Sequence, residues 1–139
     1  MKYRGLIFSL SVFTAIGTSL YWILVFTKIF PLEEIVPGYI VWFNSFPLAD
    51  FWIVITSVLL AVGIRINKTS LVIISGLLTA SAMIFLALNA LLFGINTGTI
   101  FMLTMDSFIE LGIKIYCISV GVFFIKQFSK QLVYFTMKK

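Results

Sequence analysis

Three ionisable side chains in the last third of the chain are spaced for joint chemistry: Asp106, Glu110 and Lys114. Residues four apart share one face of a helix, so the two carboxylates and the amine form a single stripe. The surrounding stretch, residues 104–127, is apolar enough to enter a bilayer, where ionisable groups are costly and usually mark a functional site with a partner. Asp106, Glu110 and Lys114 are therefore the first candidate binding residues.

Three interpretations of this stripe stay open. Glu110 precedes Lys114 by four residues, the favourable order for a helical ion pair that fixes helix packing. Alternatively, Glu110 titrates or binds a ligand in an outward-opening site for an ion, a proton or a polar substrate, with Asp106 beside it. The third interpretation is an interface with another membrane protein. In each case Lys114 lies near the bilayer centre and should face a bundle interior or a water-filled cavity rather than lipid.

The amino-acid composition places these charges in an integral membrane protein. Of 139 residues, 61% are hydrophobic and 11% are charged, whereas a soluble domain is about 45–50% apolar. A chain of this length cannot bury that surplus in its own core, so most of the apolar surface must face lipid. The pattern indicates an all-α fold, a bundle of four transmembrane helices.

The residue types also exclude several kinds of chemistry. The sequence has no histidine, so it offers no imidazole for haem, zinc or copper ligation or for a serine–histidine pair. The single cysteine, Cys117, can form neither an internal disulfide nor a C-x-x-C pair, and we interpret it as a small residue of the helix core. We assign no catalytic residue, no metal ligand and no cofactor.

Apolar runs bounded by proline, glycine and charged residues define the helices of a single domain. Pro31 ends the first run, a basic turn at 65–69 separates the second from the third, and residues 94–99 have the composition of a turn. The predicted helices cover residues 5–30, 47–65, 70–94 and 101–126, followed by an amphipathic tail at 127–139.

The segment between the first two helices, residues 31–46, is too apolar for a solvated loop and too interrupted for a membrane span. Its aromatic residues, Tyr39, Trp42 and Phe43, are of the types found at headgroup depth. We expect an interfacial or partly re-entrant segment here.

Small and hydroxyl-bearing residues at helical spacing mark packed faces. In the first helix, Ser11, Thr14 and Thr18 share a stripe that reaches Tyr21 or Trp22, which indicates close helix packing or the wall of a polar cavity. In the third helix, Gly76 and Ala80 form a small-xxx-small pair that predicts close approach of another helix.

Two further polar residues belong to the candidate binding set. Asp50 falls in the first turn of the second helix, where the helix dipole favours a carboxylate. If that helix neighbours the fourth, Asp50, Asp106 and Glu110 share one outward-facing acidic pocket. Asn89 is the strongly polar side chain of the third helix and serves either helix packing or ligand binding.

The basic residues predict an orientation in the membrane. Four spans place both termini on one side, and that side carries every basic residue except Lys28 and Lys114. The positive-inside rule then predicts cytoplasmic termini in a multi-pass protein of the plasma membrane, with the acids toward the outer face. Because these basic residues flank apolar runs, we expect no nucleic-acid partner.

Three classes of function fit this sequence. The first is a non-enzymatic accessory or interaction subunit of a membrane complex, which docks through the charge stripe and the aromatic segment at 33–46. The alternative is a small ion- or proton-coupled transport or permeation protein that acts as an oligomer, because four short helices enclose little cavity. The third is an intramembrane enzyme acting on lipid or quinone, with the stripe as its acid–base groups. The expected partners are the lipid bilayer and either further copies of this chain or other membrane proteins.

Overall fold

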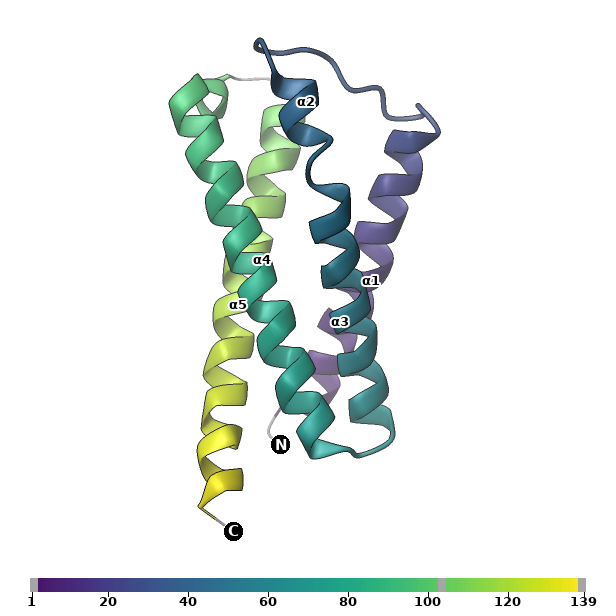
Figure 1. The fold of residues 1–139 in the computed structure, drawn as a ribbon, viewed down its shortest axis with the longest axis vertical. Coiled ribbons are helices and arrows are strands. Elements are labelled where there is room, and N and C mark those ends of the chain that lie inside the picture. The colour runs from purple at the N-terminus through teal and green to yellow at the C-terminus, as the bar shows by residue number, and fades with distance from the viewer. Residues whose placement is uncertain (1–2, 103–104, 138–139) are drawn as a thin grey trace.

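Residues 3–102 and 105–137 are described in the computed structural model of the protein, with the backbone alone described at 105–107 and 135–136. Their regular structure is entirely helical. It consists of α1 (Arg4–Phe26), α2 (Tyr39–Phe43), α3 (Pro47–Arg65), α4 (Thr69–Thr97), the 3₁₀-helix η1 (Thr99–Phe101) and α5 (Met105–Thr136). The long helices stand side by side, and the short α2 lies at the end of the bundle opposite the start of α1 (Figure 1).

Four stretches of this structure are long and apolar enough to cross a membrane: Arg4–Phe26, Tyr39–Arg65, Thr69–Thr97 and Phe108–Tyr134. The predicted all-α bundle of four long apolar helices is therefore confirmed, and it is the arrangement expected of a multi-pass membrane protein. The start of α1 and the end of α5 lie at the same end of the bundle (Figure 1).

Four helix ends differ from the prediction. α5 begins at Met105 rather than at residue 101, because Thr99–Phe101 form the 3₁₀-helix η1 and Met102 is extended. α1 ends at Phe26 rather than near residue 30, because the chain turns at Lys28, which has a positive φ of 58°. α4 continues to Thr97 and ends at Gly98, whose φ of 74° is a left-handed conformation that glycine adopts without strain. α5 runs unbroken to Thr136, so the expected tail is part of the same helix. The tail contains no proline or glycine to end it.

Each long helix packs against the next one along the chain, so that α4 lies between α3 and α5. The backbones of α1 and α5 stay farther apart and meet through long side chains. The hydroxyl oxygens of Thr14 and Tyr116 are 2.8 Å apart, and the ring of Phe13 meets that of Tyr116 edge to face at 5.6 Å between centroids. The α1–α5 seam is therefore looser than the contacts between helices that follow each other along the chain.

Helices α4 and α5 approach closely where glycine leaves room. A Cβ atom at Gly121 would lie 3.0 Å from the carbonyl oxygen of Ala80, and one at Gly76 would strike the ring of Phe128. Ala80 and Phe128 are completely buried. The predicted close contact at Gly76 and Ala80 is therefore confirmed, and it lets α5 lie against the backbone of α4.

The hydroxyl stripes also face inward. Ser11 and Thr14 of α1 are buried, as are Ser75 and Thr79 of α4. Each of these hydroxyls donates a hydrogen bond to the carbonyl oxygen four residues earlier in its own helix. Such bonds satisfy the hydroxyl without water, which suits a packed interior inside a membrane.

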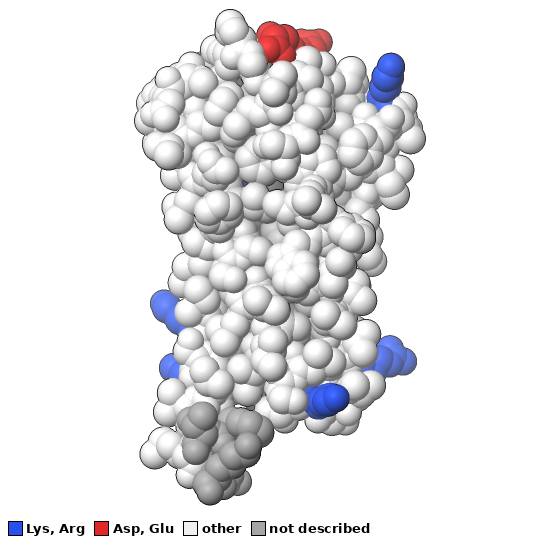
Figure 2. Space-filling view, in the orientation of Figure 1, with Lys and Arg blue, Asp and Glu red and all other residues white. Residues whose placement is uncertain are grey.

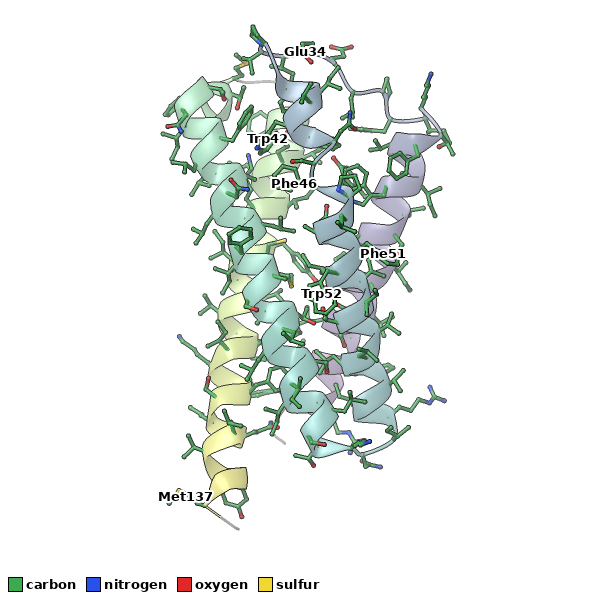
Figure 3. All side chains as sticks on the ribbon, in the orientation of Figure 1. Glu34, Trp42, Phe46, Phe51, Trp52 and Met137 are labelled. Atoms are coloured by element: carbon green, nitrogen blue, oxygen red, sulfur yellow. The ribbon has the colours of Figure 1, made fainter. Side chains whose placement is uncertain are left out.

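The chain between α1 and α3 folds over one end of the bundle. Glu34 accepts hydrogen bonds from the backbone N–H groups of Gly38, at 2.6 Å, and Ile40, at 3.1 Å, which holds the start of α2 in place. Trp42 lies below that start and stacks flat on Phe93 of α4, with 3.8 Å between ring centroids (Figure 3). The segment is thus a helical cap that leads directly into the second apolar stretch.

Charged side chains separate toward the two ends of the bundle. On the face seen in Figure 2, the acidic side chains lie at the end that carries α2, and most basic side chains gather toward the opposite end. The surface between them is uncharged on this face, as expected for the part of a membrane protein that contacts hydrocarbon.

Candidate functional site

A cavity of about 110 Å³ lies beneath α2, and predicted polar residues meet there. Asp50 of α3 and both Glu110 and Lys114 of α5 line it, although α4 separates the two helices. The fold therefore brings Asp50 to the ion pair across the interior of the bundle. That these residues bind a ligand stays a prediction.

Glu110 and Lys114 form an ion pair within α5. Lys114 Nζ donates to Glu110 Oε2 at 3.0 Å, and the two side chains are only 9% and 23% exposed. The other carboxylate oxygen of Glu110 accepts a hydrogen bond from the Tyr39 hydroxyl of α2. Because both oxygens have a partner, the pair also ties α5 to the helical cap. This geometry favours the interpretation of the stripe as a packing ion pair.

The Lys114 ammonium points toward the capped end of the bundle. Helical side chains slant toward the N-terminus of their own helix, and α5 begins at that end. A Cβ atom added at Gly94 would lie 3.6 Å from Lys114 Nζ and 3.6 Å from Thr99 Oγ1. Lys114 is buried, so it faces the bundle interior as expected and not lipid. Its alkyl stem carries the charge upward, away from the middle of the helix.

Asp50 lies in the first turn of α3, three residues after Pro47, as the sequence predicts. Trp22 of α1 donates its indole N–H to Asp50 Oδ2 at 2.9 Å. Across residues 3–102 and 108–134, where side chains are described, Asp50 has no basic partner and no other side-chain hydrogen bond. The carboxyl group of Asp50 is therefore partly buried and held by one neutral donor among the described side chains.

Aromatic rings form much of the wall around this carboxylate. They come from α1, from α2 and from the start of α3, and comprise Tyr21, Trp22, Trp42, Phe43 and Phe46. Trp22 and Phe43 lie 5.2 Å apart between ring centroids, and Trp42 meets Phe46 edge to face at 4.6 Å. Figure 3 shows Trp42 and Phe46 in the space below α2. Residues of the cap thus form part of the cavity wall.

A second cavity, of about 500 Å³, lies between α1 and α5. Thr14, Thr18 and Tyr116 contribute hydroxyl groups to its lining, so the stripe on α1 serves both as a packed face and as a cavity wall. Asp50 and Cys117 line this cavity as well as the smaller one. The Asp50 carboxylate therefore stands at the boundary of the two.

One of the two remaining candidate residues lies outside the described side chains, and the other is not part of this arrangement. Asp106 belongs to the first turn of α5, but its side chain lies outside the described residues. Asn89 of α4 is exposed on the outside of the bundle and lines neither cavity, so it neither packs inside nor reaches Asp50. At 3.6 residues per turn, Asn89 lies about 120° around the helix from the buried Met83, which explains its outward position.

The neutral partners of the charged groups, Trp22 and Tyr39, are absent from the residues that the sequence singled out for binding. Tryptophan and tyrosine near helix ends are expected at headgroup depth without any polar partner. One signal did point inward: Trp22 continues the four-residue spacing of Thr14 and Thr18. That spacing places the indole on the face of α1 that packs against α3.

Within the part of the chain that the structure describes, no three His, Cys, Asp or Glu side chains are grouped to hold a metal ion. Comparisons of the chain with protein-family models, with curated proteins and with solved structures gave no match. The function is therefore inferred from the cavities themselves.

Proposed function

We propose that this protein binds a lipophilic organic cation at Asp50 and that it belongs to the class of small membrane transport or permeation proteins. One observation carries the proposal: a partly buried carboxylate, held only by a neutral indole N–H among the described side chains, stands in a cavity walled by aromatic rings. The charge, the chemistry of the walls and the size of the cavity each support such a ligand.

The charges around the cavity favour a cation over an anion. Lys114 and Glu110 neutralise each other as an ion pair. Asp50 then leaves one negative charge without a cationic partner among the described residues. A bound cation supplies that partner, whereas an anion would meet two carboxylates. In an environment of low dielectric constant the attraction is stronger than in water, which offsets part of the ligand's lost hydration.

The walls favour an organic cation over a metal ion. A cation above the face of a tryptophan or tyrosine ring gains about 0.5–2 kcal/mol, and both Trp22 and Trp42 line the cavity. Ca²⁺ and Mg²⁺ instead take about six oxygen ligands. The volume, about 110 Å³, is comparable with the roughly 150 Å³ of an apolar cavity that holds benzene. A quaternary ammonium head group is of this size class.

The proposal includes an orientation of the protein in the membrane. Basic side chains gather toward the end of the bundle opposite α2, where α1 begins and α5 ends. By the positive-inside rule we place both termini in the cytoplasm and the Asp50 cavity near the outer face of the plasma membrane.

Ligand binding to the purified protein in lipid nanodiscs tests the proposal. Benzyltrimethylammonium is the probe, and neopentylbenzene, in which carbon replaces the charged nitrogen, is its neutral counterpart. Fluorescence of Trp22 and Trp42 reports binding because both line the cavity. Asp50→Asn keeps an acceptor for Trp22 but removes the charge. We expect it to weaken cation binding about ten- to hundredfold, the equivalent of about 1.5–3 kcal/mol for a charge-assisted contact.

Glu33→Gln is the matched control, since Glu33 is an exposed carboxylate near the same end and lines neither cavity. Its affinity for the cation should equal that of the wild type. Equal cation affinity in the wild type and Asp50→Asn, or tighter binding of neopentylbenzene than of the cation, would refute the proposal. Uptake of the cation into proteoliposomes, present in the wild type and lost in Asp50→Asn, then tests transport.

The accessory-subunit hypothesis is supported by a different surface from the one predicted. Glu110 and Lys114 face the interior, and Tyr39 and Phe43 of the cap are buried, so these residues offer little to a docking partner. Asn89, in contrast, is exposed about two turns before the end of α4. A polar side chain that faces hydrocarbon is stabilised by a hydrogen bond to another helix.

An amide both donates and accepts hydrogen bonds, so the same residue of a second copy satisfies it. We therefore propose self-association through the Asn89 face of α4 as the second candidate role. The groups that could act as acid and base in an intramembrane enzyme, Glu110 and Lys114, are paired with each other. That class of function stays an untested prediction.

A further inference from the structure

We infer that the cavity between α1 and α5 holds the hydrocarbon chain of the ligand whose cationic head group lies at Asp50, so that the ligands are single-chain amphiphilic ammonium compounds. This inference rests on the proposed function and adds the nature of the ligand's tail. The tail cavity, about 500 Å³, is several times larger than the head-group cavity, about 110 Å³.

The two cavities adjoin along a common wall. Tyr21, Ile53 and Ile113 line both of them, together with Asp50 and Cys117. No helix separates the carboxylate from the larger cavity, because Asp50 itself lines it. Because Asp50 lines the larger cavity as well, a molecule whose tail lies between α1 and α5 can bring its charged head to Asp50.

Two glycines leave the tail cavity open from opposite sides. Gly17 of α1 and Gly112 of α5 both line it, and a Cβ atom at either position would meet no atom within 4 Å. Glycine inside a helix costs about 1 kcal/mol relative to alanine. At Gly76 and Gly121 close helix packing accounts for that cost. At Gly17 and Gly112 no neighbouring atom packs against the glycine. The absence of a side chain there leaves room for another molecule.

The tail cavity opens toward the outer surface of the bundle, which in a bilayer is the lipid side. Phe13, 63% exposed, and Ile109, 43% exposed, stand on opposite helices at its rim. Gly17 lies about 3 Å along the axis from the middle of α1 at 1.5 Å per residue, so the opening falls within the span. An alkyl chain enters this opening sideways from the hydrocarbon layer, while its charged head is drawn to the carboxylate.

Two cationic probes separate the tail from the head group. Benzyltrimethylammonium has the head group and no alkyl chain, and octyltrimethylammonium has both. Gly112→Leu and Gly17→Leu each add a side chain at a residue that lines the tail cavity, from opposite helices, and the Cβ atom at either position meets no atom within 4 Å. Gly5→Leu is the control, because Gly5 is equally open but lines neither cavity. All proteins are compared in nanodiscs of one lipid, so that partition of the chain into the bilayer cancels.

The leucine variants in the tail cavity should bind octyltrimethylammonium about tenfold more weakly, as expected when a filled space excludes a chain. Their affinity for benzyltrimethylammonium and their helicity by circular dichroism should match those of the wild type and Gly5→Leu. If both variants keep full affinity for octyltrimethylammonium while benzyltrimethylammonium binds, the inference is overturned and the proposed function stands. If neither cation binds the wild type, both are overturned. Loss of a copurifying phospholipid from the variants, with unchanged octyltrimethylammonium affinity, assigns the cavity to bilayer lipid and also overturns the inference.

Discussion

Replacing Lys114 by methionine isolates the structural role of the buried ion pair. The ammonium lies 3.0 Å from Glu110, and the two side chains are 9% and 23% exposed. Methionine keeps the apolar stem and removes the charge, so the carboxylate is left uncompensated in an apolar interior. Breaking a buried pair in this way costs about 3–5 kcal/mol. Because Glu110 is partly exposed and keeps its hydrogen bond from Tyr39, we expect a loss at or below the lower end of this range, about 2–3 kcal/mol.

The matched double substitution, Glu110→Gln with Lys114→Met, removes both charges. The new amide still accepts the hydrogen bond from Tyr39, and no buried charge lacks a partner, so about half or more of the lost stability should return. The free energy of unfolding in mixed detergent micelles, followed by helical circular dichroism, measures both variants. The reasoning is refuted if Lys114→Met is as stable as the wild type, or if the double variant is no more stable than Lys114→Met.

Two further predictions concern other faces of the bundle. Gly121→Ala should destabilise the fold by about 1–3 kcal/mol, because its Cβ would lie 3.0 Å from the Ala80 carbonyl oxygen and closer still to the side chain of Ile84; Gly5→Ala, which meets open space, should lose nothing in the same unfolding assay. Asn89→Leu should weaken self-association by about 0.6–2 kcal/mol, roughly three- to thirtyfold, measured as energy transfer between labelled copies in liposomes. Unchanged energy transfer would contradict the proposed contact through α4.

The long helices are predictable from the sequence because their determinants are local. An apolar run inside a membrane satisfies the hydrogen bonds of its backbone only as a helix. Pro47 occupies the first helical position of α3, where its missing N–H would have no partner in the helix. The predicted ends of α1 and α5 differ from the observed ends, Phe26 and Thr136, for an equally local reason. Apolar composition continues past Phe26, and helix-forming residues continue into the tail, so neither boundary coincides with a change in hydropathy.

The candidate site is only partly predictable because it depends on which helices adjoin. Spacing along the chain places Glu110 and Lys114 on one face of α5, and the ion pair follows from it. Asp50 lines the same cavity as that pair, although its helix is separated from α5 by α4, and no spacing within one helix predicts this. Asn89 shows the opposite failure. Its polarity suggests an inward position, but the direction it faces is set by how α4 is wedged between α3 and α5.

Two seams of the bundle differ in their contacts, and these contacts oppose opening to different degrees. Along α4 and α5, glycine brings backbone against side chain at Gly76 and Gly121, and separating these helices would open voids in close-packed surfaces. Between α1 and α5, a hydrogen bond joins Thr14 to Tyr116. Such a bond contributes only about 0.5–1.5 kcal/mol net. The seam between α1 and α5 therefore opens at a lower cost than that between α4 and α5, and Asp50 lines the cavity at this seam.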